Sequence, residues 1–332
     1  MRTDKKPIFN WQWLHPRYWP LWLLIAFWYL LVLLPYPLLV LMGKALGRML
    51  MIFGRTRRLI AQRNIELCFP ELSPQQRKKI LVESFESGGM AFLEMGMAWW
   101  WPNWRLKNLC RVNGLQHIQN LQGQGAVLLG MHFTTLDIGG TGLSLYQSYG
   151  SMYRAHDNPV FDYVQLRGRS RERFVGEEEL VIFPREDLRT MIRLLKKGKA
   201  VWYAPDQDYG KQHSVFAPFF GIPAATITAT AKLVQMGNAK VLPFTHKRLA
   251  YCRGYEITIH PPLENYPTGD ELNDATHINQ IIEQQVRLNP GQYLWAHRRF
   301  KSRPDGGLDC YPEIFAARAA RRKKRMARHQ KE

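Results

Sequence analysis

The fold of this chain is decided by the stretch Gly123-Gln-Gly-Ala-Val-Leu-Leu-Gly-Met-His-Phe-Thr-Thr-Leu-Asp137. Its apolar run from Ala126 to Leu129 predicts a buried strand, because a short apolar run led in by glycines is typical of strands inside a sheet. The strand ends at His132, and either of the threonines after it can cap a helix that carries Asp137 in its first turn. We therefore expect a strand, a short loop and a helix in this order.

His132 and Asp137 are the first candidate catalytic pair. Residues five apart on a regular helix point about 140° away from each other, but His132 precedes the helix, so the carboxylate can reach back to the imidazole. A neutral imidazole, with a reference pKa of about 6.5, can accept a proton near physiological pH, and a carboxylate on its second nitrogen stabilises the imidazolium. The pair suits removal of a proton from an attacking hydroxyl. The same spacing also fits a purely structural contact.

Length and charge limit the possible functions. A chain of 332 residues forms one large domain or two small ones. A formal net charge of +19 and a pI near 9.9 imply an acidic partner, which is nucleic acid, an anionic membrane surface or an acidic protein. The four cysteines are far apart and show no C-x-x-C spacing, so we expect reduced thiols and no zinc site.

The N-terminal part of the chain predicts a membrane anchor. After a short basic N-terminus over 1–17, residues 18–43 carry no charge and are mostly apolar. About 20 apolar residues span a bilayer as a helix, so we expect a transmembrane or membrane-inserted helix over 18–43. Pro35 breaks this helix late, which leaves both a single-pass and a monotopic arrangement open. The basic residues that follow place the domain over 44–304 in the cytoplasm by the positive-inside rule.

Strand and helix patterns alternate along this domain, which predicts an α/β layered fold. We expect helices within 64–106, 188–199, 226–236 and 277–288, and strands at 126–129, 200–204, 240–244 and 255–259, the last as an edge or hairpin strand. Residues 216–221 are expected to form an apolar turn. A methionine and tryptophan stripe over 90–101 fits either a core or a lipid groove. A basic tail over 305–332 ends the chain.

Two polar patterns have more than one interpretation. Four arginines at alternate positions from Arg167 to Arg173 predict either a solvated basic strand or a cradle for an anion. Asp206 and Asp208 follow a strand with the D-x-D-x-G spacing that begins a calcium loop, but the remaining calcium ligands are missing. We therefore expect no metal, and these carboxylates are expected to hold arginines or lysines of the same cleft.

Several motifs occur in the order typical of one enzyme family. They are His15-Pro-Arg-Tyr-Trp19, Arg63-Asn-Ile-Glu-Leu-Cys-Phe-Pro70, Glu94-Met-Gly-Met-Ala-Trp99, His132-x-x-x-x-Asp137, Tyr153-Arg154 with Asp157-Asn158-Pro159, Trp202-Tyr-Ala-Pro-Asp-Gln-Asp-Tyr-Gly210 and His297-Arg-Arg-Phe-Lys301. From about His15 to Pro304 the chain resembles the late acyltransferases of lipid A biosynthesis, the Kdo-lipid IVA lauroyltransferase family of Gram-negative bacteria. Asp137 stands where many relatives carry glutamate, and either acid can orient an imidazole.

The resemblance implies an acyltransferase with a glycerol-phosphate-acyltransferase-like α/β fold, in which helices flank a central, mostly parallel sheet and an anchor helix precedes it. Such an enzyme lies in the bacterial inner membrane, with membrane lipids around it and its catalytic domain facing the cytoplasm. It moves a fatty acyl group from acyl carrier protein to the hydroxyl of a 3-hydroxyacyl chain of Kdo-lipid IVA, without a metal or organic cofactor. An acidic carrier and a phosphorylated acceptor would suit the basic charge.

The finer specificity stays open. Closeness of the motifs favours a lauroyl donor, but relatives that use myristoyl or palmitoleoyl donors share them. A glycerolipid or another glycolipid is an alternative acceptor. A membrane-anchored nucleic-acid-binding protein is a remote alternative, prompted by the charge and the basic tail. With the family resemblance, no nucleic-acid partner is expected.

The resemblance also assigns candidate residues. His132 is the expected general base, and Asp137 is expected to orient it. Arg169 lies in the family's second motif and Asp206 in its third, which makes both secondary candidates. The remaining, weaker candidates for contacts with acceptor phosphates are Arg154, Arg298 and Arg299. A backbone N–H or Arg169 could stabilise the tetrahedral oxyanion. Since no serine or cysteine occupies a nucleophile motif, we expect direct acyl transfer without an acyl-enzyme.

Overall fold

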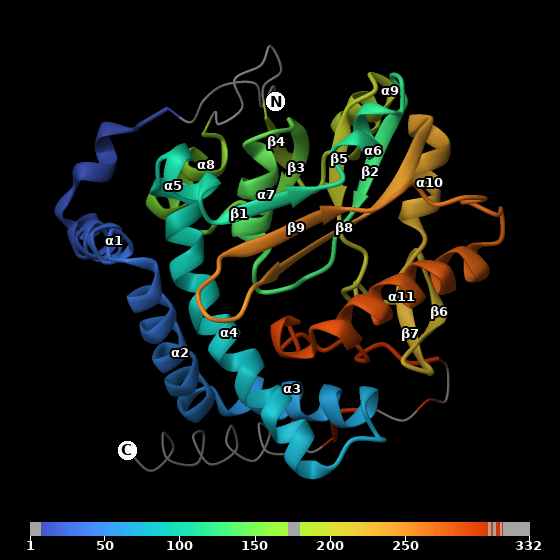
Figure 1. Cartoon of the computed structure of the whole chain (residues 1–332), viewed down its shortest axis with the longest axis horizontal. Coiled ribbons are helices and arrows are strands. Elements are labelled where there is room, and N and C mark those ends of the chain that lie inside the picture. Colours follow the sequence, from blue (N-terminus) through green and yellow to red (C-terminus); the bar gives the residue numbers. More distant parts are fainter. Residues whose placement is uncertain (1–7, 172–179, 305–306, 308–309, 313, 315–332) are drawn as a thin grey trace, which may run out of the picture.

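A computed structural model describes residues 8–171, 180–304, 307, 310–312 and 314 (Figure 1). Most of the basic tail predicted over 305–332 lies outside the described residues, and so does Arg173 of the predicted arginine pattern. The first seven residues of the predicted basic N-terminus are also outside them. The described part consists of a central sheet with helices on both faces and a long helix that crosses below it (Figure 1).

The central sheet confirms the predicted α/β class. Its strands stand in the order β1-β9-β8-β2-β5-β3-β4, and every neighbouring pair is parallel except the hairpin of β8 and β9. The strands are β1 (Cys110–Asn113), β2 (Gly125–Leu129), β3 (Tyr149–Tyr153), β4 (Val181–Pro184), β5 (Ala200–Tyr203), β8 (Ala239–Arg248) and β9 (Tyr255–Ile259). The strand predicted at the quoted stretch is therefore β2, near the middle of the sheet.

Both faces of β2 are buried, as its continuous apolar run predicts. Val127 and Leu129 belong to a core shared with α9 (Leu188–Lys196) and α10 (Ala229–Gly237). Ala126 and Leu128 point to the other face, because successive strand side chains alternate. Their core is shared with α4 (Pro74–Trp100), α7 (Leu136–Ser144) and α8 (Pro159–Arg169). This two-sided burial produces the three-layer arrangement.

The predicted helix over 18–43 is two helices in the structure, α1 (Trp19–Val32) and α2 (Tyr36–Phe53). The chain leaves helical geometry at Leu33–Pro35, since proline has no N–H to continue the ladder. Among the described residues, α2 is the one helix long and apolar enough to cross a membrane, and little of it is buried. The 14 residues of α1 would extend about 21 Å, which is less than the ~30 Å thickness of a hydrocarbon core.

Helix α2 packs closely against α4 (Figure 1). Gly43 and Gly47 on α2 face Gly89 on α4, and a Cβ added to Gly89 would meet the backbone of both. Small residues four apart allow such a close approach of two helix backbones. Helix α4 begins at Pro74, and its N-cap residue Ser73 forms a reciprocal capping box with Gln76.

Two sequence predictions were wrong in detail. Residues 216–221, expected to be a turn, lie mostly in an antiparallel hairpin of β6 (Ser214–Phe219) and β7 (Ile222–Ile227), and only Phe220 and Gly221 turn the chain. Helix α10 therefore starts at Ala229, after β7. The described arginines of the alternating pattern do not form a strand either, since residues 167–169 end helix α8.

The remaining described elements complete the layers. They are α3 (Arg55–Cys68), α5 (Asn103–Lys107), α6 (Gln116–Gln119), α11 (Glu271–Leu288) and the 3-10 turns η1 (Trp11–Leu14), η2 (Pro16–Tyr18) and η3 (Pro290–Gln292).

Candidate functional site

The candidate site lies where two neighbouring parallel strands end. Strands β2 and β5 pair side by side, with Leu129 opposite Tyr203. His132 follows Leu129 by three residues, and Asp206 follows Tyr203 by three residues. Because the carboxyl ends of parallel strands meet at one edge of a sheet, the two side chains arrive at the same place. This edge is also where open α/β sheets bind ligands.

His132 and Asp206 form a close contact. The imidazole Nδ1 lies 2.5 Å from Asp206 Oδ1, and the His132 backbone N–H donates to Oδ2 at 2.8 Å. Tyr293 donates its hydroxyl to the same Oδ2 at 3.0 Å. An ionised carboxylate only accepts hydrogen bonds, so Nδ1 carries a proton and Nε2 keeps its lone pair. The Asp206 side chain is 1% exposed and that of His132 is 22% exposed, which leaves the imidazole accessible to a substrate.

The electrostatics favour an imidazole that readily accepts a proton. Burial lowers the pKa of His132, but the charge of Asp206 and its hydrogen bond outweigh burial and raise the pKa above its ordinary value of 6.5. Burial raises the pKa of Asp206, yet His132 and the hydrogen bonds lower it overall, so this carboxyl stays ionised. Burial is the main cause that lowers the pKa of His246 and of His297 to about 4. Both of these neighbours are neutral near physiological pH.

The expected contact between Asp137 and the imidazole is not the one that the structure has. Asp137 does lie in the first turn of α7, as predicted, and Thr135 occupies the N-cap position, but its side chain makes no capping hydrogen bond. Its Oδ1 accepts a hydrogen bond from Arg169 Nη2 at 2.9 Å, and both side chains are about one-quarter exposed, at 23% and 26%. The imidazole nitrogen is instead occupied by Asp206. The reason is non-local, because β5 brings a second carboxylate closer than the helix turn does.

A small cavity lies beside this ion pair. Its lining includes Asp137, Arg169, Tyr149 and Trp202. The Trp202 ring also stands edge-on to the His132 imidazole, with ring centroids 6.2 Å apart. Asp137 and Arg169 thus belong to the surroundings of the histidine without contacting its Nδ1.

The three weaker candidates are placed very differently. Arg154 is exposed just after β3, and Arg298 is half-buried after η3. Arg299 is 3% exposed and donates to Ala225 O at 2.6 Å and to Thr226 Oγ1 at 2.9 Å. Because its guanidinium is used inside the protein, a contact of Arg299 with acceptor phosphates does not fit its burial.

The Asp208 carboxylate is hydrogen-bonded to the protein's own residues. It accepts hydrogen bonds from the backbone and side chain of Ser302 at 2.7 and 2.9 Å, and Lys301 Nζ lies 3.9 Å away. Asp208 therefore has a lysine beside it, as expected. Asp206 contacts a histidine in place of the expected arginine or lysine. Within the described ranges, no cluster of three or more histidine, cysteine or acidic side chains could hold a metal ion.

The methionine and tryptophan stripe lies partly in the core and partly along a cavity. Met97 and Trp99 are buried in the core. Trp99 and Trp100 also line a cavity of about 940 Å³ between α1, α4 and α8, together with Trp22 and Tyr29 of α1. An apolar space therefore adjoins the N-terminal helices.

The loop that carries His132 is held by the segment after η3. Leu294 N–H donates to His132 O at 3.0 Å, and Phe133 forms an antiparallel bridge with Tyr293. Thr134 N–H donates to Gln292 O at 2.8 Å. Little in the sequence indicates these roles, because Tyr293 and Gln292 are separated from the histidine by more than 150 residues of chain.

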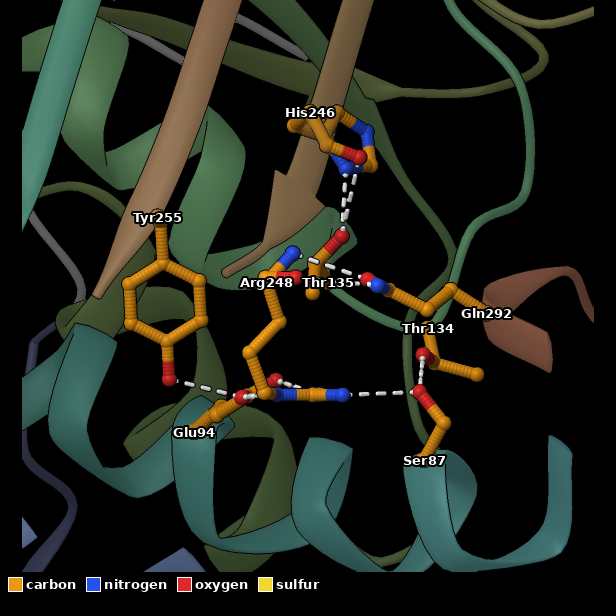
Figure 2. A network of polar contacts seen from close by, with 8 residues as sticks. All are labelled: Ser87, Glu94, Thr134, Thr135, His246, Arg248, Tyr255 and Gln292. Carbon is orange, nitrogen blue, oxygen red and sulfur yellow. Dashed lines mark hydrogen bonds and ion pairs between the residues drawn. The ribbon is translucent and has the colours of Figure 1, made fainter. Parts of the chain in front are cut away.

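The sequence also did not indicate a group of buried polar residues beside this loop. Figure 2 shows Ser87 and Glu94 of α4 joined to Arg248, Tyr255 and Thr134. Glu94 stood in one of the quoted motifs, but nothing in the sequence paired it with Arg248. A charged residue inside an otherwise apolar helix face was the available signal.

Comparison with known proteins agrees with the motifs. The chain matches the family described as bacterial lipid A biosynthesis acyltransferase over residues 6–302. It is 42% identical over 303 residues to the lipid A biosynthesis lauroyltransferase of Escherichia coli (strain K12), covering 90% of this chain and 97% of that protein. It is also 42% identical over 306 residues to the palmitoleoyltransferase of that organism, covering 91% and 98%. Identity to its myristoyltransferase is 30% over 314 residues, covering 92% and 94%.

These matches extend over nearly the whole chain, the histidine site included, and they confirm the resemblance seen in the motifs. The chain therefore belongs to the bacterial lipid A biosynthesis acyltransferases.

Proposed function

We propose that this acyltransferase moves a fatty acyl group from acyl carrier protein to the hydroxyl of a 3-hydroxyacyl chain of Kdo-lipid IVA. Family membership supports a lipid A precursor as acceptor. The net charge of +19 supports an acidic carrier as donor and a phosphorylated acceptor. Lauroyl is the proposed acyl group, and the equal identity to a palmitoleoyltransferase makes that acyl group the main alternative.

His132 is the proposed general base, with Asp206 as the carboxylate that orients it. The observation that carries this proposal is the contact of Nδ1 with a buried, ionised Asp206, which leaves Nε2 to accept a proton. Such a base contributes about 10²–10⁴-fold to a rate. Asp137 takes a different part in the proposal, because it holds Arg169 beside the site.

The proposed transfer is direct. The acceptor hydroxyl loses its proton to His132 Nε2 as its oxygen bonds to the thioester carbonyl carbon. The carbon–sulfur bond then breaks, and the imidazolium returns the proton to the departing thiolate. Arg169 is the proposed neighbour that favours the oxyanion of the tetrahedral intermediate, since its charge lies at the same edge of the sheet. The site requires no metal in this scheme.

The proposed location is the bacterial inner membrane, with the catalytic domain on the cytoplasmic side. Helix α2 supports membrane contact through its length and apolar composition. By the positive-inside rule, a cytoplasmic domain is supported by Lys44 and Arg48 within α2 and by the arginines that begin α3. Inner-membrane lipids, including the acceptor, would then lie beside the apolar helices.

The test is acyl transfer from a panel of acyl carrier proteins to Kdo-lipid IVA, with the wild type and His132→Ala compared. We expect transfer by the wild type, fastest with a lauroyl donor, and a loss of about 10²-fold or more in the variant. No transfer by folded wild type would reject this donor and acceptor. Equal transfer by both proteins would keep the reaction and discard the base, and a trapped acyl-enzyme would contradict direct transfer.

A further inference from the structure

A chain of buried polar contacts reaches the histidine loop from helix α4 (Figure 2). Ser87 Oγ lies 2.5 Å from Thr134 Oγ1, and Thr134 stands two residues after His132. Arg248 donates from Nη1 to the same Ser87 oxygen at 2.8 Å. Because the guanidinium has no acceptor, the Ser87 hydroxyl hydrogen stays available for Thr134.

Arg248 is itself fixed by an ion pair. Its Nε and Nη2 donate to the two oxygens of Glu94 at 2.6 and 2.7 Å, and Tyr255 donates its hydroxyl to Glu94 at 2.6 Å. The Arg248 and Glu94 side chains are 7% and 4% exposed. Burial lowers the pKa of Arg248, but Glu94 outweighs it, so the pKa stays above the ordinary value and the guanidinium stays charged. Bidentate ion pairs of this kind fix geometry more than they add net stability.

The same arginine also fixes the backbone of the loop. Arg248 N–H donates to Gln292 Oε1 at 2.8 Å, and Gln292 Nε2 donates back to Arg248 O at 3.0 Å. The carbonyl of Gln292 in turn accepts the Thr134 N–H at 2.8 Å. Thr134 is therefore attached through its hydroxyl and through its backbone to groups that Arg248 organises (Figure 2).

These contacts lie outside the chemistry of the site. Among the described residues, Arg248 and Ser87 form no hydrogen bond with His132 or Asp206, and their side chains bond to Thr134 of the loop, to Glu94 of α4 and to each other. A buried ion pair that is hydrogen-bonded to a loop is suited to fixing the position of that loop. A displacement of only about 1 Å in a reacting group can lower a rate by 10²-fold.

We propose that Ser87 and Arg248 are positioning residues of the acyl transfer, which hold Thr134 and thereby set the His132 imidazole against Asp206. This inference rests on the proposed base role of His132. It also means that the base takes its position from α4, the helix that packs on α2. Arg48 of α2 donates to Glu86, the residue next to Ser87, at 2.7 Å.

The sharpest test compares two buried serines on α4. Ser87→Ala removes the contact with Thr134 and Arg248, whereas Ser84→Ala removes a hydroxyl whose one hydrogen bond within the described part of the chain is to Leu81 O of its own helix. We expect Ser87→Ala to lower kcat about 10-fold or more, because a small displacement of the imidazole lowers the rate of the chemical step. We expect little change in KM. We expect Ser84→Ala to keep kcat within about twofold of the wild type.

A pH profile separates positioning from a general loss of stability. Loosening the His132–Asp206 contact weakens the cause that raises the pKa of His132, so the acid limb of kcat/KM in Ser87→Ala moves to lower pH. Thr134→Val should show the same shift, and Thr134→Ser should restore both rate and limb, because it keeps the hydroxyl. Circular dichroism on each purified variant verifies the fold.

The outcomes distinguish the two proposals. A folded Ser87→Ala with the kcat and acid limb of the wild type overturns the positioning role if His132→Ala is inactive. Full activity in His132→Ala defeats the base itself, whatever Ser87→Ala does. A lower rate in Ser87→Ala with an unmoved acid limb, together with a Thr134→Ser rate as low as that of Thr134→Val, also overturns it, since that is the pattern of a structural defect alone.

Discussion

At the scale of single residues, the contact of His132 with Asp206 would tie the pH dependence of the proposed reaction to one hydrogen bond. His132 must be neutral to act as the proposed base, and its pKa is raised above 6.5. Activity of the wild type should therefore rise with pH through a value above 6.5. The same raised pKa stabilises the fold at low pH, a contribution that is present below about 6.5 and is lost as pH rises through the folded-state value.

Replacing Asp206 by asparagine tests this contact. The charge that raises the pKa of His132 is lost while burial still lowers it, so the acid limb of kcat/KM should move to lower pH, below its position in the wild type. The rate above the limb should fall about 10²–10⁴-fold, because an amide does not stabilise the imidazolium or fix its tautomer. The measurement is a pH–rate profile of kcat/KM from pH 5 to 9, taken with both proteins.

Asp137→Asn is the matched control, since it neutralises the carboxylate that follows His132 in sequence but contacts Arg169. We expect its acid limb to stay where the wild type has it, even if the rate falls. A shift of the limb in Asp137→Asn together with none in Asp206→Asn would return the orienting role to Asp137.

The candidate site could be predicted from the sequence only as far as its local part. His132 was found because a histidine after a buried strand and before a helix is a local pattern. Its partner was missed because Asp206 is joined to it by the pairing of β2 with β5, and strand order is not written in any local spacing. The Asp137 carboxylate was nearer in sequence, but the sheet brings Asp206 to the imidazole.

At the scale of elements, the strands and helices with a clear apolar period were predicted and the hairpin of β6 and β7 was not. Pro218 and Gly221 made 216–221 resemble a turn. In the structure, Pro218 stands in β6, whose one partner among the described strands is β7, and proline is tolerated in such edge strands. The break between α1 and α2 was found because Pro35 acts locally. The close approach of α2 to α4 depends on which helices meet, which the sequence alone did not reveal.

That approach predicts opposite effects for two adjacent glycines of α4. A Cβ at Gly89 would meet the backbone of Gly43 and Gly47, so Gly89→Ala should force α2 away and destabilise the protein by about 1–3 kcal/mol. A Cβ at Gly88 would meet no atom of the described residues within 4 Å, so Gly88→Ala should stabilise the helix by up to about 1 kcal/mol. Thermal unfolding in detergent, monitored by circular dichroism, should give the highest midpoint for Gly88→Ala, an intermediate one for the wild type and the lowest for Gly89→Ala.

This pair of variants also probes the path from α4 to the site. Gly89 is two residues from Ser87, so a shift of α4 in Gly89→Ala should lower kcat as well as the unfolding midpoint. An unfolding midpoint for Gly89→Ala at or above that of Gly88→Ala would contradict the backbone contact between α2 and α4.

At the scale of the whole molecule, apolar surface is concentrated on the first two helices. Phe27 of α1 is 63% exposed and Leu41 of α2 is 65% exposed, and both helices carry further large apolar side chains on their surfaces. Many exposed apolar side chains on neighbouring helices are typical of a membrane contact. The charged layer begins within α2 itself, at Lys44 and Arg48, so the apolar and basic parts of the molecule adjoin.

A double substitution, Phe27→Lys with Leu41→Lys, tests whether this surface lies in lipid. Lysine at the centre of a membrane helix is less favourable than leucine by about 3 kcal/mol, so each change should weaken insertion strongly. In water, both positions are exposed, and the fold should be kept.

The matched control is Leu188→Lys with Leu272→Lys, which changes leucines that are 49% and 48% exposed on α9 and α11. After a high-salt wash that removes electrostatic binding, we expect the wild type and control in the membrane fraction and the Phe27/Leu41 variant largely in the supernatant. Equal retention of all three proteins would mean that α1 and α2 do not anchor the chain, and that its apolar surface serves another contact.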